Sequence, residues 1–314
     1  MKGTRQQAMS DGGQIQASSL VRALNVVGDA WTVLLLKEAF LGVRRFNEFQ
    51  ESLGIPRQTL ALRLAALADH HILYKKPVLH RTIVQEYRLT PKGLDLYDFI
   101  ISVWAWHKRW DIGAHFLPGE LLHKPCGHLL EVRLVCRECG DPVVRADIRT
   151  EAGEGSGFDP KPAARHSRMN DAAFSKSTGV EPSRMVATTV IGDRWSNLVL
   201  DAIFRGVNSF QAIKNELEIA SNILSSRLKK LAELGLIDSA SEGRRIDYHV
   251  TERGEGLFDV FLSLTGWGDR WLSGSSGVPQ VLVHRCENVL DARYVCAHCG
   301  MTVRAWEVDL PRPE

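Results

Sequence analysis

The stretch RFNEFQESLGIPRQTLALRLAAL, from Arg45 to Leu67, carries the signals that decide the fold. Phe46, Phe49 and Leu53 have the i, i+3, i+7 spacing of a short amphipathic helix. A break, GIP, follows, and its proline suits the first turn of a second helix because its missing N–H would be unpaired there. Two short helices joined by a tight turn predict a helix-turn-helix. The second helix turns a leucine stripe inward, made of Leu60, Leu64 and Leu67.

The same pattern occurs a second time in the chain. When Val26 is laid onto Val190, 16 of the 42 residues from there to Leu67 and Leu231 are identical. The shared residues include a GDxW motif, which is GDAW in the first copy and GDRW in the second. The chain is therefore predicted to contain two copies of one domain.

Each helix-turn-helix is followed by two β-prone runs with a basic middle. These are ILYKKPVLHRTIVQEYRLT in the first copy and LIDSASEGRRIDYHVT in the second, and each predicts the hairpin wing of a winged helix. Thr90 and Thr251 come next, in position to cap helices that begin TPKG and TERG.

The helices that begin TPKG and TERG end in aligned tryptophans, Trp106 and Trp110 in one copy and Trp267 and Trp271 in the other. These side chains could fill the core of each domain, form a seam between the copies, or line a small-molecule pocket. All three environments are apolar, so the sequence alone does not separate them. A seam would make one chain an intrachain pseudo-dimer, and further dimerisation stays open.

Each copy ends in a CxxCG motif, CRECG at Cys136 and CAHCG at Cys296. A third cysteine precedes each motif, with a histidine just upstream of it. Because C-x₂-C is a common half-site for tetrahedral zinc, we expect two zinc ions per chain, each held by one copy's own residues. The expected ligands are His123, Cys126, Cys136 and Cys139 in the first copy and His284, Cys286, Cys296 and Cys299 in the second.

Two alternatives to zinc stay open at this stage. CxxC dithiols can act as a redox switch in the cytosol, and free cysteines are also common core residues. His128 could replace His123 as a ligand in the first copy, but the second copy has Asn288 at the corresponding position.

These signals predict a mainly α fold with small β elements, in which two winged helix-turn-helix domains are each followed by a small Cys/His β-module. The stretch TEAGEGSGFDPKPAARHSRMN is rich in Gly and Pro and is expected to be a flexible linker. The predicted segments are a flexible N-terminus (1–17), the first winged helix (18–113), its β-module (114–149), the linker (150–170), the second winged helix (171–273) and its β-module (274–308).

The composition is that of an ordinary soluble protein: of 314 residues, 44% are hydrophobic and 24% are charged. No stretch approaches the roughly 18 apolar residues of a membrane span, and the N-terminus lacks the apolar core of a signal peptide. We therefore expect a cytoplasmic protein without a membrane partner. The net charge is only +2, so any nucleic-acid binding has to come from local basic patches.

The order of the motifs GDAW, RFNEF, LALRLAAL and EYRLTPKG, with an aromatic-ended helix after them, resembles the HxlR family of bacterial transcriptional regulators. The second copy has GDRW, SFQAI, LSSRLKKL and DYHVTERG. The resemblance covers residues 18–113 and 182–273 and implies a winged helix-turn-helix that binds double-stranded DNA. Family members usually carry one such domain and pair as homodimers. Some sense oxidants through a cysteine near the start of the domain, and neither copy has a cysteine there.

In a helix-turn-helix the second helix enters the major groove, and its N-terminal residues face the base edges. With the leucines inward, Arg57, Gln58 and Ala61 face outward in the first copy. Arginine pairs best with guanine, and asparagine or glutamine with adenine. The corresponding residues in the second copy are Ser221, Asn222 and Ser225. This difference predicts that one chain, acting as a pseudo-dimer, recognises two unlike half-sites.

Basic side chains on the helices and wings are expected to contact phosphates, which gives affinity without sequence information. Arg63 and Arg227 lie beside the leucine stripe, so a structural salt bridge is as good an explanation for them as a phosphate contact. The other candidates are Arg44, Arg45, Lys75, Lys76 and Arg81 in the first copy and Lys229, Lys230, Arg244 and Arg245 in the second.

Together the patterns predict a sequence-specific DNA-binding transcriptional regulator that associates with the nucleoid when bound, and a small-molecule effector stays open. The sequence contains no G-x-S-x-G, Walker or HExxH motif, so no enzyme is predicted. The alternatives are a winged-helix adaptor between proteins, or a metal or redox sensor that uses the CxxC modules.

Overall fold

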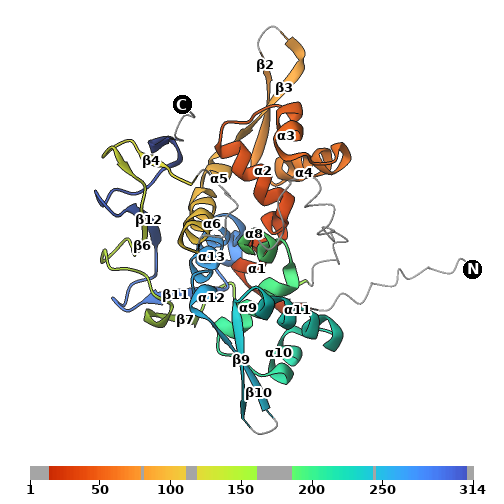
Figure 1. Ribbon diagram of the computed structural model, residues 1–314, viewed down its shortest axis with the longest axis vertical. Helices are drawn as coiled ribbons and strands as arrows, with labels where there is room; N and C mark the ends of the chain where they lie inside the picture. Colours follow the sequence, from red (N-terminus) through yellow and green to blue (C-terminus); the bar gives the residue numbers. More distant parts are fainter. Residues whose placement is uncertain (1–13, 79–80, 111–118, 161–185, 243–244, 310–314) are drawn as a thin grey trace, which may run out of the picture.

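The structure is a computed structural model that describes residues 14–78, 81–110, 119–160, 186–242 and 245–309. The predicted fold class is confirmed, since two winged helices of similar order are each followed by short strands (Figure 1). The first winged helix contains α1 (Ser19–Val27), α2 (Ala30–Phe40), α3 (Phe46–Leu53), α4 (Arg57–Asp69), β2 (Leu73–Val78), β3 (Arg81–Leu89), α5 (Pro91–Leu94) and α6 (Tyr97–Trp110). The second contains α8 (Val186–Ile191), α9 (Arg194–Phe204), α10 (Phe210–Leu217), α11 (Ser221–Glu233), β9 (Ile237–Glu242), β10 (Arg245–Val250), α12 (Glu252–Glu255) and α13 (Phe258–Leu272).

The turn inside each helix-turn-helix uses a left-handed residue to end the first helix. In the first copy this is Gly54 with φ 59°, and in the second it is Glu218 with φ 47°. Glycine adopts this conformation without steric cost, whereas glutamate is an uncommon residue there. Pro56 is the N-cap residue of α4, one position before the first turn in which it was predicted.

Both predicted wings and both threonine caps are confirmed. The strands β2 and β3 pair antiparallel, as do β9 and β10. The Thr90 hydroxyl accepts a hydrogen bond from the Gly93 N–H at 3.1 Å, and Thr251 caps Gly254 at the same distance. A Cβ at Gly93 would lie 2.2 Å from the Ile72 carbonyl oxygen, so the glycine of TPKG lets the capped helix pack against the wing.

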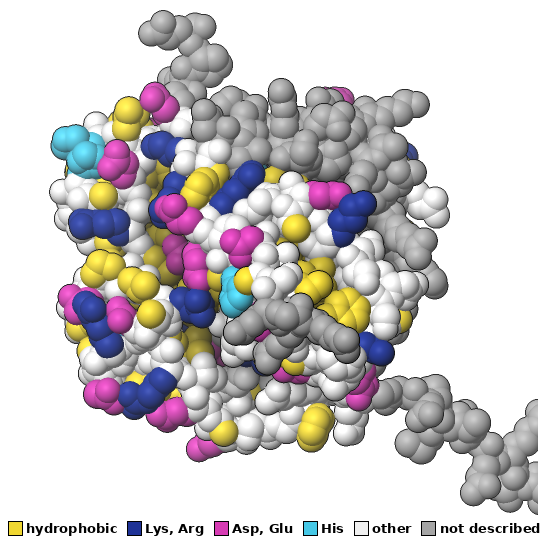
Figure 2. Space-filling model, turned by 60° about the horizontal axis from the view of Figure 1, so that its bottom comes forward, with side chains coloured by type: hydrophobic (Ala, Val, Ile, Leu, Met, Phe, Trp, Pro, Cys, Tyr) yellow, Lys and Arg dark blue, Asp and Glu magenta, His cyan; other side chains and the backbone are white. Residues whose placement is uncertain are grey.

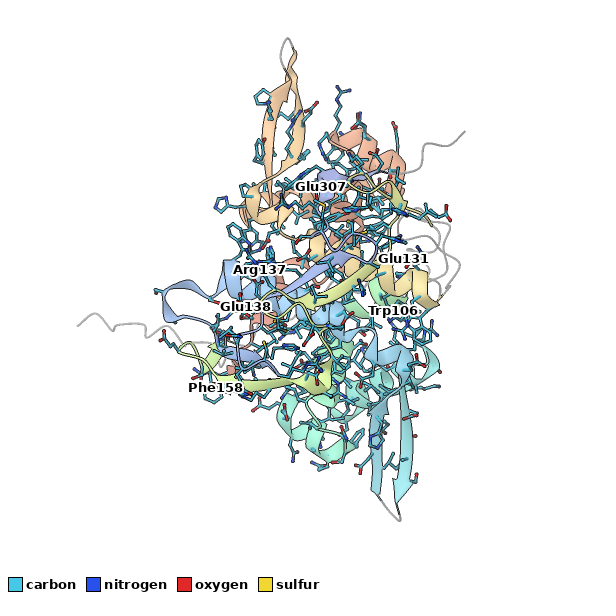
Figure 3. All side chains as sticks on the ribbon, turned by 90° about the vertical axis from the view of Figure 1, so that its left-hand side faces the viewer. Trp106, Glu131, Arg137, Glu138, Phe158 and Glu307 are labelled. Carbon is cyan, nitrogen blue, oxygen red and sulfur yellow. The ribbon has the colours of Figure 1, made fainter. Side chains whose placement is uncertain are left out.

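The β-modules of the two copies are one interwoven structure. The first copy supplies β4 (Leu122–His123), β5 (His128–Leu129), β6 (Val132–Cys136) and β7 (Ile148–Ala152), and the second supplies β11 (Gln280–His284), β12 (Ala292–Cys296) and β13 (Val308–Asp309). Between copies, β6 pairs with β12, β7 with β11 and β4 with β13, all antiparallel. Figure 3 looks onto these strands and shows Arg137 and Glu138 at the first CxxC turn.

Part of the predicted linker and of the predicted flexible N-terminus forms strands instead. Residues 150–152 belong to β7, and Phe158–Pro160 forms β8, which pairs with β1 (Gln14–Gln16). The Gly- and Pro-rich composition predicted no strand here. The strands form because they pair with residues far away in the sequence, which local composition does not reveal. The rest of the predicted linker, residues 161–170, lies outside the described residues.

The winged helices meet along a seam of helices. The helix α1 packs along α13, and a Cβ at Gly268 would lie only 2.4 Å from the Ser19 carbonyl oxygen. On the other side of the seam a Cβ at Gly192 would lie 2.9 Å from the Ala30 Cβ. Glycine at these points lets the two copies approach more closely than any other residue would.

The aligned tryptophans belong to this seam, which decides between the three explanations that the sequence left open. The indole N–H of Trp106 donates to the Arg253 carbonyl of the second copy, and that of Trp267 donates to the Lys92 carbonyl of the first, both at 3.0 Å. Both indole rings are buried. Lys92 and Arg253 occupy corresponding positions in the copies, so the contact is made twice with opposite direction.

Figure 1 shows the consequence for the whole arrangement. The wings β2–β3 and β9–β10 lie at opposite ends of the long axis, with α4 and α11 on the side away from the β-modules. Among the described helices none is long and apolar enough by itself to cross a membrane, although α1 and α2, bent by 78°, match the length and composition as a pair.

Candidate nucleic-acid interface and metal sites

The second helices of the two helix-turn-helix motifs present the predicted residues to solvent. In α4 the leucine stripe is buried, while Arg57, Gln58 and Ala61 are exposed. In α11 the corresponding Ser221, Asn222 and Ser225 are exposed above a buried stripe of Leu224, Leu228 and Leu231. Contact of these side chains with bases remains a prediction.

Arg63 and Arg227 make the structural salt bridge that the sequence offered as one of two explanations. Arg63 Nε lies 2.8 Å from a carboxylate oxygen of Asp29, and Arg227 Nε lies 2.6 Å from Asp193. Asp29 also accepts from the Thr32 N–H at 3.2 Å and so caps α2. The pair therefore fixes α4 against the start of α2. The aspartate and the arginine are both identical in the two copies. This shared identity is the signal in the sequence that could have revealed the pairing.

Arg44 also has a structural role in the described residues. Its guanidinium donates to the Val43 carbonyl at 3.0 Å and to the Ala39 carbonyl, and burial lowers its pKa. Arg44 thus closes the turn after α2, and its phosphate contact stays a prediction. The neighbouring Arg45 is exposed and lies 3.7 Å from Glu48.

The wings differ in charge. Lys75 and Lys76 are exposed on β2, where β9 has Ser239 and Ala240. Lys229 is exposed on α11, with Glu233 3.7 Å away, and Lys230 is half-buried. Arg81 and Arg245 begin β3 and β10, but their side chains and the whole of Arg244 lie outside the described residues.

The eight predicted metal ligands form two Cys₃His groups. His123 and Cys126 of the first copy join Cys296 and Cys299 of the second, while Cys136 and Cys139 join His284 and Cys286. In each group the four donor atoms lie within 4.8 Å of one another. The histidines are fully buried, and their Nδ1 atoms face the sulfur atoms.

The expectation that each copy supplies its own set was wrong. Since β6 and β12 run antiparallel with Cys136 opposite Ala292 and Cys296 opposite Val132, each CxxC turn lies beside the His-Cys pair of the other copy. His128, the alternative ligand, stacks on His298 with ring centroids 4.6 Å apart and lies outside both groups.

The distances in each group fit a tetrahedral metal ion. Zinc–sulfur bonds of about 2.3 Å and zinc–nitrogen bonds of about 2.0 Å place two sulfurs about 3.8 Å apart and sulfur about 3.5 Å from nitrogen. The sulfur atoms of Cys126 and Cys296 are 3.8 Å apart, and those of Cys136 and Cys286 are 4.0 Å apart. The nitrogen–sulfur distances are 3.3 and 3.5 Å in each group.

The electrostatics of the second group also favour metal binding. A hydrogen bond with the His284 imidazole lowers the pKa of the Cys286 thiol to about 6. A thiolate is the form of cysteine that binds a metal ion. Each Cys₃His group can therefore hold one metal ion that joins the two copies.

Comparison with known proteins agrees with the repeat. Residues 26–113 and 190–276 both match the family described as HxlR-like helix-turn-helix. An HTH-type transcriptional regulator of Mycobacterium tuberculosis is 37% identical over 142 residues, which are 45% of this chain and 90% of the relative. The HTH-type transcriptional regulator YodB of Bacillus subtilis is 26% identical over 94 residues, which are 29% of this chain and 84% of the relative. A solved transcription-factor structure from Pseudomonas aeruginosa is 28% identical, covers 38% of this chain and 85% of that chain, and has a TM-score of 0.30.

Proposed function

The chain belongs to the HxlR-like helix-turn-helix family as a tandem duplication, and on this basis we propose that one chain acts as a pseudo-dimer that recognises two unlike DNA half-sites. The family assignment makes it a DNA-binding transcriptional regulator. Such a regulator acts on chromosomal DNA in the bacterial cytoplasm.

One observation carries the half-site proposal. The exposed residues at the start of α4 are Arg57 and Gln58, whereas those at the start of α11 are Ser221 and Asn222. Both helices lie on the face opposite the β-modules (Figure 1). Since a guanidinium favours guanine and an amide favours adenine, the two ends of one chain select different bases.

Selection of bound DNA from a random pool tests the proposal on the purified full chain. We expect one chain per duplex and two half-sites that differ in sequence. A perfect palindrome bound by one chain would overturn the unlike half-sites. Binding should also weaken steeply as salt rises, because lysine and arginine side chains displace ions from the phosphates. No binding at about 50 mM salt would favour the protein–protein adaptor instead.

We further propose that the two Cys₃His groups hold zinc as structural clasps between the copies. The support is the near-tetrahedral spacing of three sulfurs and one nitrogen, the donor set that zinc prefers. When bound, zinc supplies a fixed tetrahedral link. At one clasp the ion would be held by His123, Cys126, Cys296 and Cys299. At the other clasp it would be held by Cys136, Cys139, His284 and Cys286.

Elemental analysis of the purified chain tests this second proposal. We expect two zinc ions per chain, and one in the Cys299→Ser variant, whose second clasp is intact. A chain without metal in which at least four of the six thiols oxidise reversibly would support the redox switch.

A further inference from the structure

A pocket of about 520 Å³ lies between α13 and the strands β11 and β12 of the second β-module. Its walls are mainly apolar and include Leu262, Val281 and Leu290. In Figure 2 a hollow with hydrophobic side chains at its floor runs between the β-modules, on the left, and the helices. A pocket of this size suits a small organic molecule.

The pocket follows from two differences between the copies. Gly266 and Asp269 line it on α13, and the corresponding residues on α6 are Ala105 and Lys108. In the first copy the Lys108 ammonium donates to the Leu130 carbonyl at 3.3 Å, so its side chain spans the space between α6 and the segment that joins β5 to β6. Aspartate is shorter and cannot donate this bond, so the equivalent space beside Leu290 stays open.

The charged groups of the pocket leave one carboxylate without a cation. Arg270 binds Asp95 at 2.7 Å, and Arg293 binds Asp291 at 3.0 Å and lies 4.0 Å from Asp98. Arg22, the other cation near Asp269, binds Asp159 at 2.8 Å. Within the described part of the chain, Asp269 forms no salt bridge. The Ser19 hydroxyl lies close enough to lower the pKa of its carboxyl group, but its Oδ1 is buried without a hydrogen-bond partner.

Burial is unfavourable for an ionised carboxylate that lacks a directly bound cation. Burial raises the pKa of Asp269, although Ser19, Arg270 and Arg22 act in the opposite direction. A bound cation would remove this cost. An anionic ligand, in contrast, would have to compete with the carboxylates that already bind Arg270 and Arg293. The charge of the site therefore favours a positively charged ligand.

We propose that this pocket binds an apolar organic monocation, whose charged group lies at Asp269 and whose apolar body packs on Leu262, Val281 and Leu290. The ligand touches α13, which packs along α1 in the seam, and also β11, which ends at His284 of the second clasp. It is thus placed to act on the arrangement of the two winged helices. The binding itself does not depend on the proposed DNA half-sites.

Calorimetric titration of the zinc-loaded chain, without DNA, tests the proposal with probes of matched shape. Tetraphenylphosphonium and crystal violet serve as cations, and tetraphenylborate serves as the anion of the same shape as the first. We expect at least one cation to bind with one ligand per chain and the anion to bind at least about tenfold more weakly. Failure of both cations to bind, or equal binding of tetraphenylborate, would overturn the proposal.

Three variants locate the site. Asp269→Asn removes the charge and should weaken cation binding by about tenfold or more. Asp269→Lys installs the residue of the first copy and should abolish binding. Gly266→Leu fills the pocket without removing a charge, because a Cβ there meets only Arg270 Nη1, at 3.3 Å, and leucine favours a helix more than glycine does.

The matched control is Asp309→Asn, which removes an exposed carboxylate that pairs with Lys124 at 3.2 Å. It should leave the affinity unchanged. Unfolding by urea is followed for each variant, so that loss of binding is separated from loss of fold. A folded Asp269→Asn or Gly266→Leu variant that binds as tightly as the natural chain would exclude this pocket.

Discussion

At the scale of single residues, Arg63 shows how a basic side chain on the second helix of a helix-turn-helix can serve the fold. Its guanidinium lies against Asp29, whose side chain is only 12% exposed, and Arg227 and Asp193 repeat the pair. Two charges that are partly withdrawn from water are favourable only together, since either one alone keeps its desolvation cost. The helix α4 is thereby fixed to α2.

Substitution of Arg63 by alanine is expected to lower the free energy of unfolding by about 2 kcal/mol, because Asp29 is left half-desolvated without its partner. Urea denaturation of the zinc-loaded chain measures this. Arg57→Ala is the control. Arg57 is exposed, so its loss should change stability by less than about 0.5 kcal/mol while DNA affinity falls. Equal loss of stability in both variants would contradict the structural role of Arg63.

Two aspartates at corresponding positions of the copies, Asp98 on α6 and Asp259 on α13, are half-buried. Burial raises the pKa of Asp98 to about 6 and that of Asp259 to about 7. Burial, and after it the negative charge of both carboxyl groups, raises the pKa of the Tyr294 phenol. Tyr294 lies opposite Leu134 in the pairing of β12 with β6. Where β6 and β12 meet, the first copy thus supplies the apolar Leu134 and the second supplies the polar Tyr294 opposite it.

Asp259→Asn should stabilise the chain, and the gain should increase with pH. The unfolded carboxyl group loses its proton near its ordinary pKa of 3.8, whereas the folded one keeps it to about pH 7. Between these values the folded state binds more protons, so rising pH destabilises the natural chain but not the variant. The gain should grow from about pH 4 and reach the order of 4 kcal/mol above pH 7. Urea unfolding across this range checks it, and a gain independent of pH would contradict the assignment.

At the scale of elements, the two helix-turn-helix motifs share one framework and differ at their surfaces. The buried leucines recur in α4 and α11, while the exposed residues at the helix starts and on the wings do not. Packing constrains the leucines in both copies, whereas solvent-exposed positions are free to differ. The proposed difference in DNA recognition therefore depends on few residues.

Making the two helices alike tests this separation. The substitutions Ser221→Arg, Asn222→Gln and Ser225→Ala give α11 the outward residues of α4. We expect the selected DNA to change toward two identical half-sites, because only the second half-site depends on α11. The exposed positions should tolerate the change with little loss of stability. An unchanged first half-site is the internal control, and an unchanged second half-site would contradict the role of these residues.

At the scale of the whole molecule, the copies are held together by more than the chain that joins them. The strands of the β-modules pair between copies, the tryptophan rings cross the seam in both directions, and both Cys₃His groups take two ligands from each copy. The duplicated unit therefore behaves as two subunits of a dimer do, with one peptide connection added.

Cutting that connection should leave the two copies associated. A protease site inserted between residues 164 and 165, in the segment that joins β8 to α8, yields halves that share the seam and both clasps. Gel filtration of the cut, zinc-loaded chain is expected to give one species of the original size. Two separate species would show that the connection itself is needed. The uncut chain and a cut chain treated with chelator report how much the clasps contribute.

The sequence by itself determined the local features and the repetition. The leucine and phenylalanine spacing, the capping threonines and the glycine of TPKG act within a few residues, so their structures follow from nearby chemistry. The alignment of the copies also revealed all eight candidate ligands, because metal ligands are recognised by type and spacing.

Only the tertiary structure decided which residues meet. The exchange of metal ligands between copies, the strands within the predicted linker and the crossing of the tryptophans all join residues far apart in the chain. When a chain holds two equivalent copies, a CxxC motif can pair with the His-Cys pair of its own copy or with that of the other copy. The sequence of the motif is the same in both cases. The antiparallel pairing of β6 with β12 makes that choice, because it brings each CxxC turn within reach of the histidine of the other copy.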